Sequence, residues 1–408
     1  MDAMMGVPGY NNSVCGGEIV YKSKDECLSA TKVDLNTHGI AGFSPGDDVI
    51  PAAYRWPVEL SPKVDYEDYE SSVPVVDMAE LYPNEARRGL DDVAEVAKKR
   101  IVAEMLKAAE TWGVFQIVNH GVAAELMERL QAQAHKFFSL PMELKNEISV
   151  KKVSTGSVLL GYGFKVRGGS LTHCTWSEGL YLAAGDVSFL KDSANKLYSK
   201  DCDKESFVST VLEYEAAVNQ CSLQVLHLLA EGMGIDPAHF DRYLNKDVTI
   251  QRWNYYPPCP EPERTLGLLE HTDAGLLAAV HLGDVGGLQV QRDGKWFAVR
   301  PEKNGFAIIL GDMLEMMTRG RFHSVPHRAV VNKSKPRLSI GNFLFLNQTM
   351  EVVSPTDLPV PAAEEERDTR PEYRPFTFAE LLAHKLSTKP LRTFEFFKVQ
   401  HKSLVPTS

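Results

Sequence analysis

Residues 268–310 read LLEHTDAGLLAAVHLGDVGGLQVQRDGKWFAVRPEKNGFAIIL, and this stretch decides the fold class. Short apolar runs in it are split by Gly, Asp and Pro, and the same texture extends over the whole segment from Val248 to Phe345. Short strands that recur about every eight to twelve residues with such turn signals are typical of a jelly-roll or a sandwich. The segment therefore predicts a β-rich core.

Helical patterns dominate the sequence before this core. The apolar spacing predicts strands at 73–78 and 114–119 and helices over about 91–111, 123–138 and 204–233. Residues 1–70 have few apolar repeats and many Gly, Ser, Asp and Asn, which predicts an extended or partly disordered arm with a short packed piece at Tyr54 to Pro57. The sequence thus divides into an arm (1–70), an N-terminal helical part (71–235), a jelly-roll core (236–355) and a C-terminal loop and helix (356–408).

Charge and composition exclude several classes of protein. The 408 residues contain 44 Lys and Arg against 54 Asp and Glu, a net charge of −10, which disfavours a nucleic acid partner. No apolar run reaches the roughly 18–20 residues that span a bilayer, and the N-terminus lacks the basic and apolar regions of a secretory signal. The six cysteines show no C-x-x-C spacing, which favours free thiols in a reducing compartment. We therefore expect a cytoplasmic protein with no membrane partner.

The first candidate site is His271-Thr272-Asp273 in the β-rich segment. Positions i and i+2 of a strand point to one face, so this imidazole and carboxylate can bind one ion together. A second imidazole would complete a 2-His-1-carboxylate facial triad, which leaves three positions open on a non-haem Fe(II). His327 is the leading candidate for that third ligand, and His323 and His281 compete with it.

Two further motifs carry groups that suit a carboxylate ligand. Arg337 and Ser339 share one strand face, so a guanidinium and a hydroxyl point the same way. Upstream, the run Asn254 to Pro260 (NYYPPCP) places a phenol, Tyr256, where it can assist the same carboxylate, and Asn254 where it can orient an iron-bound species. On their own, the arginine would be an ordinary surface residue and the second run a strand that ends in a turn at its prolines.

Taken together, these motifs resemble the plant 2-oxoglutarate/Fe(II)-dependent dioxygenases that oxidise small natural products. The resemblance covers about Val73 to Leu382. Besides the motifs above, it rests on five segments: VPVVD from Val73, WGVFQIVNHGV from Trp112, GGLQV from Gly286, Gly311-Asp312, and SVPHR from Ser324.

The resemblance implies an α+β fold: a double-stranded β-helix (jelly-roll, cupin-like) core with N-terminal helices packed around it. It assigns His271, Asp273 and His327 to Fe(II), and Arg337, Ser339 and Tyr256 to the far carboxylate of 2-oxoglutarate. It implies O2 as co-substrate and ascorbate as reductant. One oxygen atom enters succinate and, in a hydroxylation, the other enters the substrate; desaturation is the alternative outcome. We expect a monomer that acts on a small molecule.

The substrate is less well defined by the motifs. The segment with Gly161-Tyr162-Gly163 and Trp176-Ser177-Glu178 is similar to one in gibberellin-inactivating oxidases, although a core Trp beside an exposed or paired Glu explains it nearly as well. A diterpenoid acid of the gibberellin or gibberellin-precursor type is the leading substrate, and a flavonoid (flavone or flavonol synthase type) is the rival. The side chains expected in the substrate pocket are Trp176, Phe343 and Phe345.

The sequence departs from the family pattern at positions that do not include the expected ligands: Ala278-Ala279, Arg319, Pro326 and Gly341-Asn342. We expect these positions to reshape the pocket rather than to abolish catalysis. Other classes stay open: a protein or nucleic acid hydroxylase with the same triad, and a jelly-roll binding protein that has lost its metal. A relative that uses iron without 2-oxoglutarate also keeps an Arg-x-Ser pair.

Overall fold

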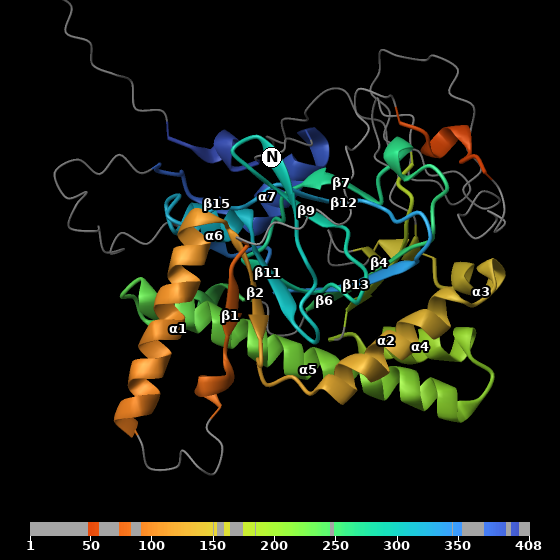
Figure 1. Cartoon of the computed structure of the whole chain (residues 1–408), viewed down its shortest axis with the longest axis horizontal. Coiled ribbons are helices and arrows are strands. Elements are labelled where there is room, and N and C mark those ends of the chain that lie inside the picture. The colour runs from red at the N-terminus through yellow and green to blue at the C-terminus, as the bar shows by residue number, and fades with distance from the viewer. Residues whose placement is uncertain are drawn as a thin grey trace, which may run out of the picture.

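The computed structural model describes residues 48–56, 73–82, 91–149, 151–152, 159–163, 174–183, 185–244, 249–344, 346–352, 371–388 and 393–399. Most of the expected arm, and Phe345, lie outside these residues. Two β-sheets form the centre of the described structure, and helices surround them (Figure 1). The predicted α+β class is confirmed.

The larger sheet has nine strands in the order β1-β2-β11-β8-β13-β6-β5-β4-β3. Their bounds, in sheet order, are Val75–Asp77, Val114–Val118, Phe306–Leu310, Leu277–His281, Arg337–Phe343, Ile250–Tyr256, Glu178–Ala183, Leu159–Gly163 and Lys151–Lys152. All its pairings are antiparallel except that of β1 with β2. Strands from both the predicted helical part and the predicted core join this one sheet; the division at residues 70, 235 and 355 stays a prediction.

The smaller sheet supplies the opposite wall of the core. It has four antiparallel strands in the order β10-β9-β12-β7, with bounds Lys295–Ala298, Leu288–Arg292, His327–Ala329 and Leu268–His271. A short pair, β14 (Glu351–Val352) with β15 (Phe376–Thr377), lies apart from both sheets.

Helices cover the other face of the large sheet. The long helix α5 (Asp201–Gly232) runs across the lower part of Figure 1 and contacts β8 and β13. The remaining helices are α1 (Asp91–Thr111), α2 (Ala124–Phe138), α3 (Met142–Asn146), α4 (Val187–Leu197), α6 (Asp312–Met317) and α7 (Phe378–Thr388). Trp253 of β6 packs edge-on against Phe137 of α2 and Phe207 of α5. Because strand residues alternate between faces, the neighbours of Trp253 on β6 point to the opposite side, toward the small sheet.

The sequence patterns located most of these elements. The predicted helix over 91–111 coincides with α1, and the predicted long helix overlaps α5. The packed piece is present as a 3-10 turn over Ala52–Tyr54, with the side chains of Tyr54 and Trp56 buried; Pro57 lies outside the described residues. Two helices were missed: α4, and the one-turn α6 inside a segment that we expected to be β-rich throughout.

The Trp176-Ser177-Glu178 segment is packed into the interior. The Nζ atom of Lys145 lies 2.5 Å from Oε2 of Glu178, which also accepts a bond of 2.7 Å from the hydroxyl of Tyr162. The Lys145 side chain is fully buried and that of Glu178 is 3% exposed. Burial, with the adjacent Glu178 carboxylate, raises the pKa of Tyr162 above its ordinary value. Glu178 is therefore a buried, paired charge between the sheet and α3.

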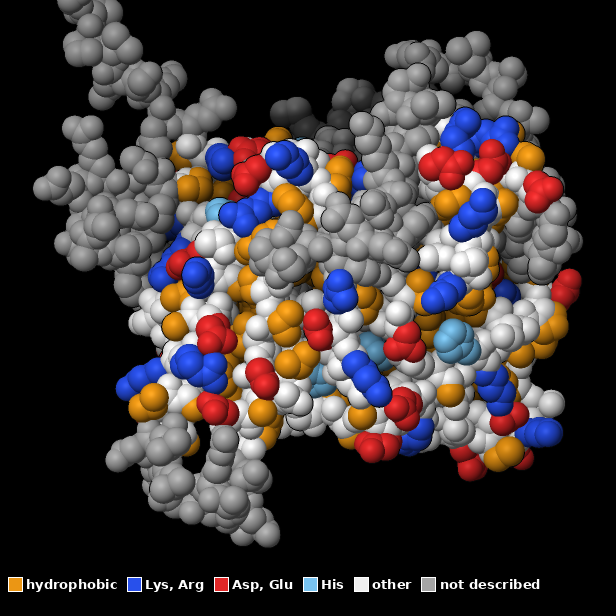
Figure 2. All heavy atoms as spheres, viewed as in Figure 1, with side chains coloured by type: hydrophobic (Ala, Val, Ile, Leu, Met, Phe, Trp, Pro, Cys, Tyr) orange, Lys and Arg blue, Asp and Glu red, His pale blue; other side chains and the backbone are white. Residues whose placement is uncertain are grey.

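The surface carries charges of both signs. Figure 2 shows acidic and basic side chains interspersed over the face in view, with apolar side chains scattered among them. Within the described part of the chain, no helix is both long enough and apolar enough to span a bilayer.

We predict that Lys145→Met lowers the free energy of unfolding by about 3–5 kcal/mol, because it leaves the Glu178 carboxylate buried without its cation. Urea-induced unfolding measures this. Lys196→Met, which breaks the largely exposed pair with Asp192, is the control and should cost no more than about 1 kcal/mol. Equal losses in the two variants would contradict the structural role of the Lys145–Glu178 pair.

Candidate functional site

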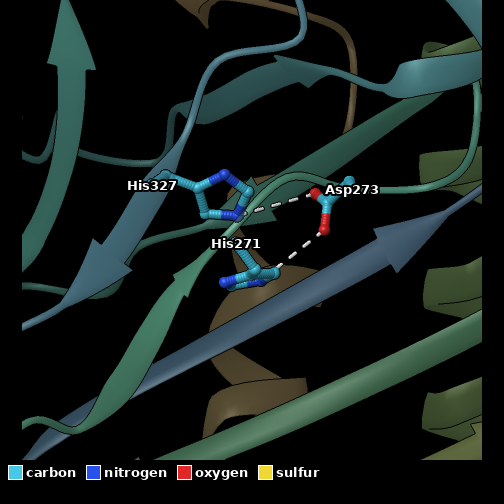
Figure 3. Close-up of side chains that lie close together, drawn as sticks. All are labelled: His271, Asp273 and His327. Atoms are coloured by element: carbon cyan, nitrogen blue, oxygen red, sulfur yellow. Dashed lines mark ion pairs between the residues drawn. The ribbon is translucent and has the colours of Figure 1, made fainter. Parts of the chain in front are cut away.

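Two imidazoles and one carboxylate meet at the edge of the small sheet (Figure 3). His271 ends β7 and His327 begins β12, and the antiparallel register places these two residues directly opposite each other. Asp273 lies just after β7. Its Oδ1 is 3.7 Å from Nε2 of His271 and its Oδ2 is 3.7 Å from Nε2 of His327. One ligand atom from each of the three residues lies within 4.8 Å of the other two, which is close enough for one ion to bind all three.

Backbone carbonyls fix the orientation of both rings. Nδ1 of His271 lies 2.7 Å from the carbonyl oxygen of Leu269, and Nδ1 of His327 lies 3.1 Å from that of Val325. Such a bond, in which Nδ1–H donates to the carbonyl, leaves the lone pair on Nε2, which in each ring lies 3.7 Å from the Asp273 carboxylate. Metal-binding histidines commonly have this support. The donor set of two nitrogens and one carboxylate fits Fe(II).

The two competing histidines lie elsewhere. His281 is buried on β8, where its Nε2 is 3.1 Å from the amide nitrogen of Gln131, and burial lowers its pKa to about 4. His323 lies in the loop before β12, and its carbonyl oxygen is so close to Gly113 that a Cβ there would come within 2.1 Å of it. Neither belongs to the His271–Asp273–His327 cluster.

A second cluster faces this one from the large sheet. On the paired strands β13 and β6, Arg337 lies opposite Tyr256 and Ser339 lies opposite Asn254. The guanidinium of Arg337 stacks over the Tyr256 ring at 4.9 Å, and its Nε donates to the carbonyl oxygen of Val285 at 3.1 Å. The structure thus brings together the four residues that the sequence placed at the carboxylate-binding end.

A glycine makes room for the stem of Arg337. Gly287 has a φ of +148°, and a Cβ at this position would lie 2.9 Å from Cδ of Arg337 and 2.8 Å from the carbonyl oxygen of Val330. Only glycine suits both this backbone conformation and this close approach. The GGLQV motif therefore shapes the end of the cavity at which the sequence predicts carboxylate binding.

Several polar atoms around this cavity are buried without a partner. They are Nη1 of Arg337, Oδ1 of Asn254 and Nε of Arg252, each with almost no exposed surface. Within the described part of the chain, no carboxylate forms an ion pair with Arg337 or Arg252. Buried polar groups are nearly always hydrogen-bonded, and a buried charge is nearly always paired. These atoms therefore indicate anionic and polar ligands.

Arg252 is the residue that the sequence reasoning missed. It lies on β6 two residues before Asn254, on the same strand face, and opposite Gly341 of β13. Its guanidinium lies 5.2 Å from the centre of the Tyr181 ring. The alternation of Arg252, Asn254 and Tyr256 along one strand was a signal that could have identified it.

A third arginine at the cavity already has partners. Arg328 donates from Nε to Oε1 of Gln289 at 2.8 Å, and its guanidinium lies 4.1 Å from the Trp296 ring centre. Burial lowers its pKa to about 10, so it stays charged at neutral pH. Arg252 and Arg337 differ from Arg328 in this respect, because each has a buried nitrogen without a hydrogen-bond partner.

One cavity contains both clusters. Together with its open mouth, it holds about 470 Å³ of space not filled by protein atoms. Leu268, Val280, Leu282 and Ile309 supply apolar wall, and Phe343 lines the end near Arg252. Small-molecule sites commonly combine such apolar walls with a few placed polar groups.

Trp176 does not line this cavity. Its side chain is fully buried, lies 5.3 Å edge-on from the Tyr54 ring, and donates from Nε1 to the carbonyl oxygen of Pro257. Its expected role in the substrate pocket gains no support from this position. Phe345 lies outside the described residues. Ala278, Ala279 and Asn342 are fully buried, whereas Gly341 lines the cavity.

Family models match two segments of the chain. Residues 248–346 match the 2OG-Fe(II) oxygenase superfamily, and residues 73–199 match the model described as non-haem dioxygenase in morphine synthesis N-terminal. The first segment contains all seven residues predicted to bind iron or 2-oxoglutarate. Fold and site together therefore define a non-haem iron oxygenase.

Curated relatives and solved structures agree with this class. The chain is 34% identical over 283 residues to oxoglutarate-dependent flavonoid 7-O-demethylase 1 of Ocimum basilicum, covering 69% of this chain and 70% of the relative. It is 31% identical over 360 residues to gibberellin 20 oxidase 1-B of Triticum aestivum, covering 86% and 93%. The crystal structure of JOX2 in complex with 2OG, Fe and JA superposes with a TM-score of 0.68 at 25% identity, covering 87% of this chain and 95% of JOX2.

The chain belongs to the 2-oxoglutarate- and Fe(II)-dependent dioxygenase family. It is an enzyme that uses Fe(II) and 2-oxoglutarate and acts on a plant small molecule. The expected jelly-roll core is confirmed by these similarities.

Proposed function

We propose that His271, Asp273 and His327 hold Fe(II), that Arg337, Ser339 and Tyr256 bind the far carboxylate of 2-oxoglutarate, and that Arg252 binds an acidic group of the substrate. The leading substrate is a diterpenoid acid of the gibberellin or gibberellin-precursor type, which is hydroxylated or desaturated. Asn254, with an unpartnered Oδ1 between the two arginines, orients what binds there.

The observation that carries the substrate class is the second unpaired guanidinium. Three arginines and a single carboxylate, Asp273, line the cavity. Fe(II) with Asp273 leaves one positive charge, and the three arginines raise the total to four. A dianionic 2-oxoglutarate leaves two positive charges. One of them is on Arg328, which already contacts Gln289 and Trp296, so the charge of Arg252 is the one available to the substrate. A carboxylate satisfies that charge, and a guanidinium binds it with two parallel hydrogen bonds.

The roles of the chain follow from its geometry. Fe(II), when bound, would provide the oxidative chemistry that acts on 2-oxoglutarate and on a C–H bond of the substrate. Two arginines hold the two ligands at separate places. Arg337 binds 2-oxoglutarate at one end of the β6–β13 ladder, where it lies opposite Tyr256. Arg252, which lies four residues away from Tyr256 on β6, binds the substrate. Apolar walls between them exclude water, and the substrate carbon is held in position by the anchoring of its acidic group.

A flavonoid is the rival substrate. The flavonoid 7-O-demethylase relative favours it, as does a naringenin,2-oxoglutarate 3-dioxygenase from Petunia hybrida, which is 32% identical over 333 residues. Phe343, at the Arg252 end of the cavity, suits an aromatic ring as well as it suits a terpenoid skeleton. A flavonoid places its acidity in phenols, which are largely neutral at pH 7, and so it satisfies Arg252 less well.

Asp273→Ala should abolish both metal binding and turnover while the fold is retained, because two imidazoles alone offer neither the charge nor the third donor. Metal content after loading with Fe(II) under argon and circular dichroism measure the two properties. Asp293→Ala, at an exposed position after β9, is the matched control. Normal metal content in Asp273→Ala would contradict the ligand assignment.

Arg337→Ala should raise the KM for 2-oxoglutarate by about thirtyfold or more, since loss of a buried charge-assisted pair costs about 2–5 kcal/mol. Steady-state release of succinate measures it. Arg100→Ala on the exposed face of α1 is the control. An unchanged KM would show that the co-substrate carboxylate binds elsewhere.

A substrate panel tests the proposed function. Purified enzyme with Fe(II), 2-oxoglutarate and O2 is offered diterpenoid acids, their methyl esters and flavanones, and the products are identified by mass spectrometry. We expect turnover of the acids, with kcat/KM for the esters lower by at least about thirtyfold. Arg252→Met should remove most of this preference for acid over ester and leave the KM for 2-oxoglutarate within a factor of about two.

Two results would overturn the substrate class. Turnover of flavanones without turnover of any diterpenoid acid would favour the rival. An acid preference that survives in Arg252→Met would show that another group binds the acid. Arg252→Lys, which keeps the charge but loses the fork geometry, should fall between the wild-type enzyme and Arg252→Met.

A further inference from the structure

A fully buried carboxylate lies directly behind the metal-binding cluster. Asp312, the first residue of α6, has no exposed side-chain surface. Its Oδ1 accepts a bond of 2.7 Å from the hydroxyl of Ser324, and its Oδ2 lies 3.2 Å from the hydroxyl of Thr272. Its backbone N–H donates to the carbonyl oxygen of Asp273 at 2.7 Å.

These contacts reach both segments that carry the cluster. Thr272 stands between His271 and Asp273, so Asp312 holds the first segment by a side chain and by the backbone. Ser324 stands three residues before His327, and its N–H also donates to Oε2 of Glu315 at 2.6 Å. Asp312 is thus a common support for the two strand ends whose separation decides whether three donors share one ion.

The charge of Asp312 is balanced by a residue from the far end of the chain. Nζ of Lys385, on α7, lies 2.5 Å from Oδ2 of Asp312 and donates to the hydroxyl of Thr272 at 2.8 Å. The Lys385 side chain is only 18% exposed. The same C-terminal segment also contacts the end of α6, where Nε of Arg319 donates to the carbonyl oxygen of Pro371.

We propose that Lys385 is a positioning residue for the iron site: by neutralising Asp312 and bonding Thr272, it couples the docking of the C-terminal helix to the affinity of the enzyme for its metal. Lys385 does not line the cavity, so it acts through Asp312 and Thr272 and not by contact with substrate. The inference rests on the ligand assignment made under the proposed function.

The physical reason is the cost of a buried charge without a partner. Without Lys385, the Asp312 carboxylate must attract water or reorient, and either change disturbs its bonds to Thr272 and Ser324. The two ligand-bearing segments then lose their shared support. Residues that orient metal ligands in this way typically change metal affinity by about 10–100-fold when they are replaced.

The test measures metal affinity with no substrate present. Mn(II), a redox-inert probe, is titrated under argon into the full-length enzyme by calorimetry. Lys385→Met should weaken Mn(II) binding by about 10–100-fold, and Lys385→Arg should restore most of the affinity. Lys398→Met, which removes a lysine of the same segment from its partly exposed pair with Glu395, should leave it within about twofold. Circular dichroism checks that each variant is folded.

A double-mutant cycle separates positioning from general loss of stability. Asp312→Asn removes the charge that Lys385 balances, so Lys385→Met should add little further loss in that background, within about twofold. Additive losses, an unchanged Mn(II) affinity in Lys385→Met, or an equal loss in Lys398→Met would each overturn the inference. Normal Mn(II) affinity in Asp273→Ala would instead overturn the proposed ligands, so the two failures are distinguishable.

Discussion

The site depends on the cross-strand register in both sheets. His327 lies opposite His271 in the small sheet, and Arg337 lies opposite Tyr256 in the large one. Side chains alternate along a strand, so a slip of one residue in either pairing would turn the donor or the guanidinium away from the cavity. The glycine that lets Arg337 pass, Gly287, lies on the turn into β9, which is the other neighbour of β12. The pairing of the strands therefore sets the positions of the metal-binding and guanidinium side chains. It also brings residues that are distant in sequence together in one cluster.

Charge is the second constraint, and it follows from burial. The cavity concentrates arginines in a place where the described structure offers only one carboxylate, Asp273. Arg328 is accommodated by Gln289 and Trp296, but Arg252 and Arg337 have buried nitrogens without partners. An enzyme can maintain such an arrangement when its ligands supply the missing negative charge. Under the proposed function, the two guanidiniums favour anionic ligands over neutral analogues, because a neutral analogue would leave the arginine buried and unpaired.

The sequence predicted contacts between residues that are close in the chain better than contacts between residues that are far apart in it. The pairing of His271 with Asp273 is local, and the sequence predicted it from strand alternation, although β7 ends at His271 and Asp273 lies just beyond it. The choice of His327 over His281 and His323 depends on the register of β12, which only the order of motifs suggested. The Trp176-Ser177-Glu178 segment was ambiguous because burial and pairing are tertiary properties: Glu178 finds its partner Lys145 thirty-three residues away. Lys385 could not be found at all, since it meets Thr272 across 113 residues and no sequence pattern predicts that contact.

The layout of the β6–β13 ladder explains how one catalytic centre can serve many substrates. Residues at the Arg337–Tyr256 end are those proposed to bind the co-substrate, which is the same in every turnover, whereas Arg252, Gly341 and Phe343 lie further along the same strands. A side chain at Gly341 would place its Cβ 3.1 Å from the Phe343 ring, so the ring would have to shift by a few tenths of an ångström at this end of the cavity. Substitutions there leave the pairing of Arg337 with Tyr256 intact because backbone hydrogen bonds carry the register. Under the proposed assignment, substrate choice can change at one end of two strands while iron and 2-oxoglutarate binding are preserved at the other. Two relatives at 34% and 31% identity, whose names give a flavonoid and a gibberellin substrate, are consistent with such a division.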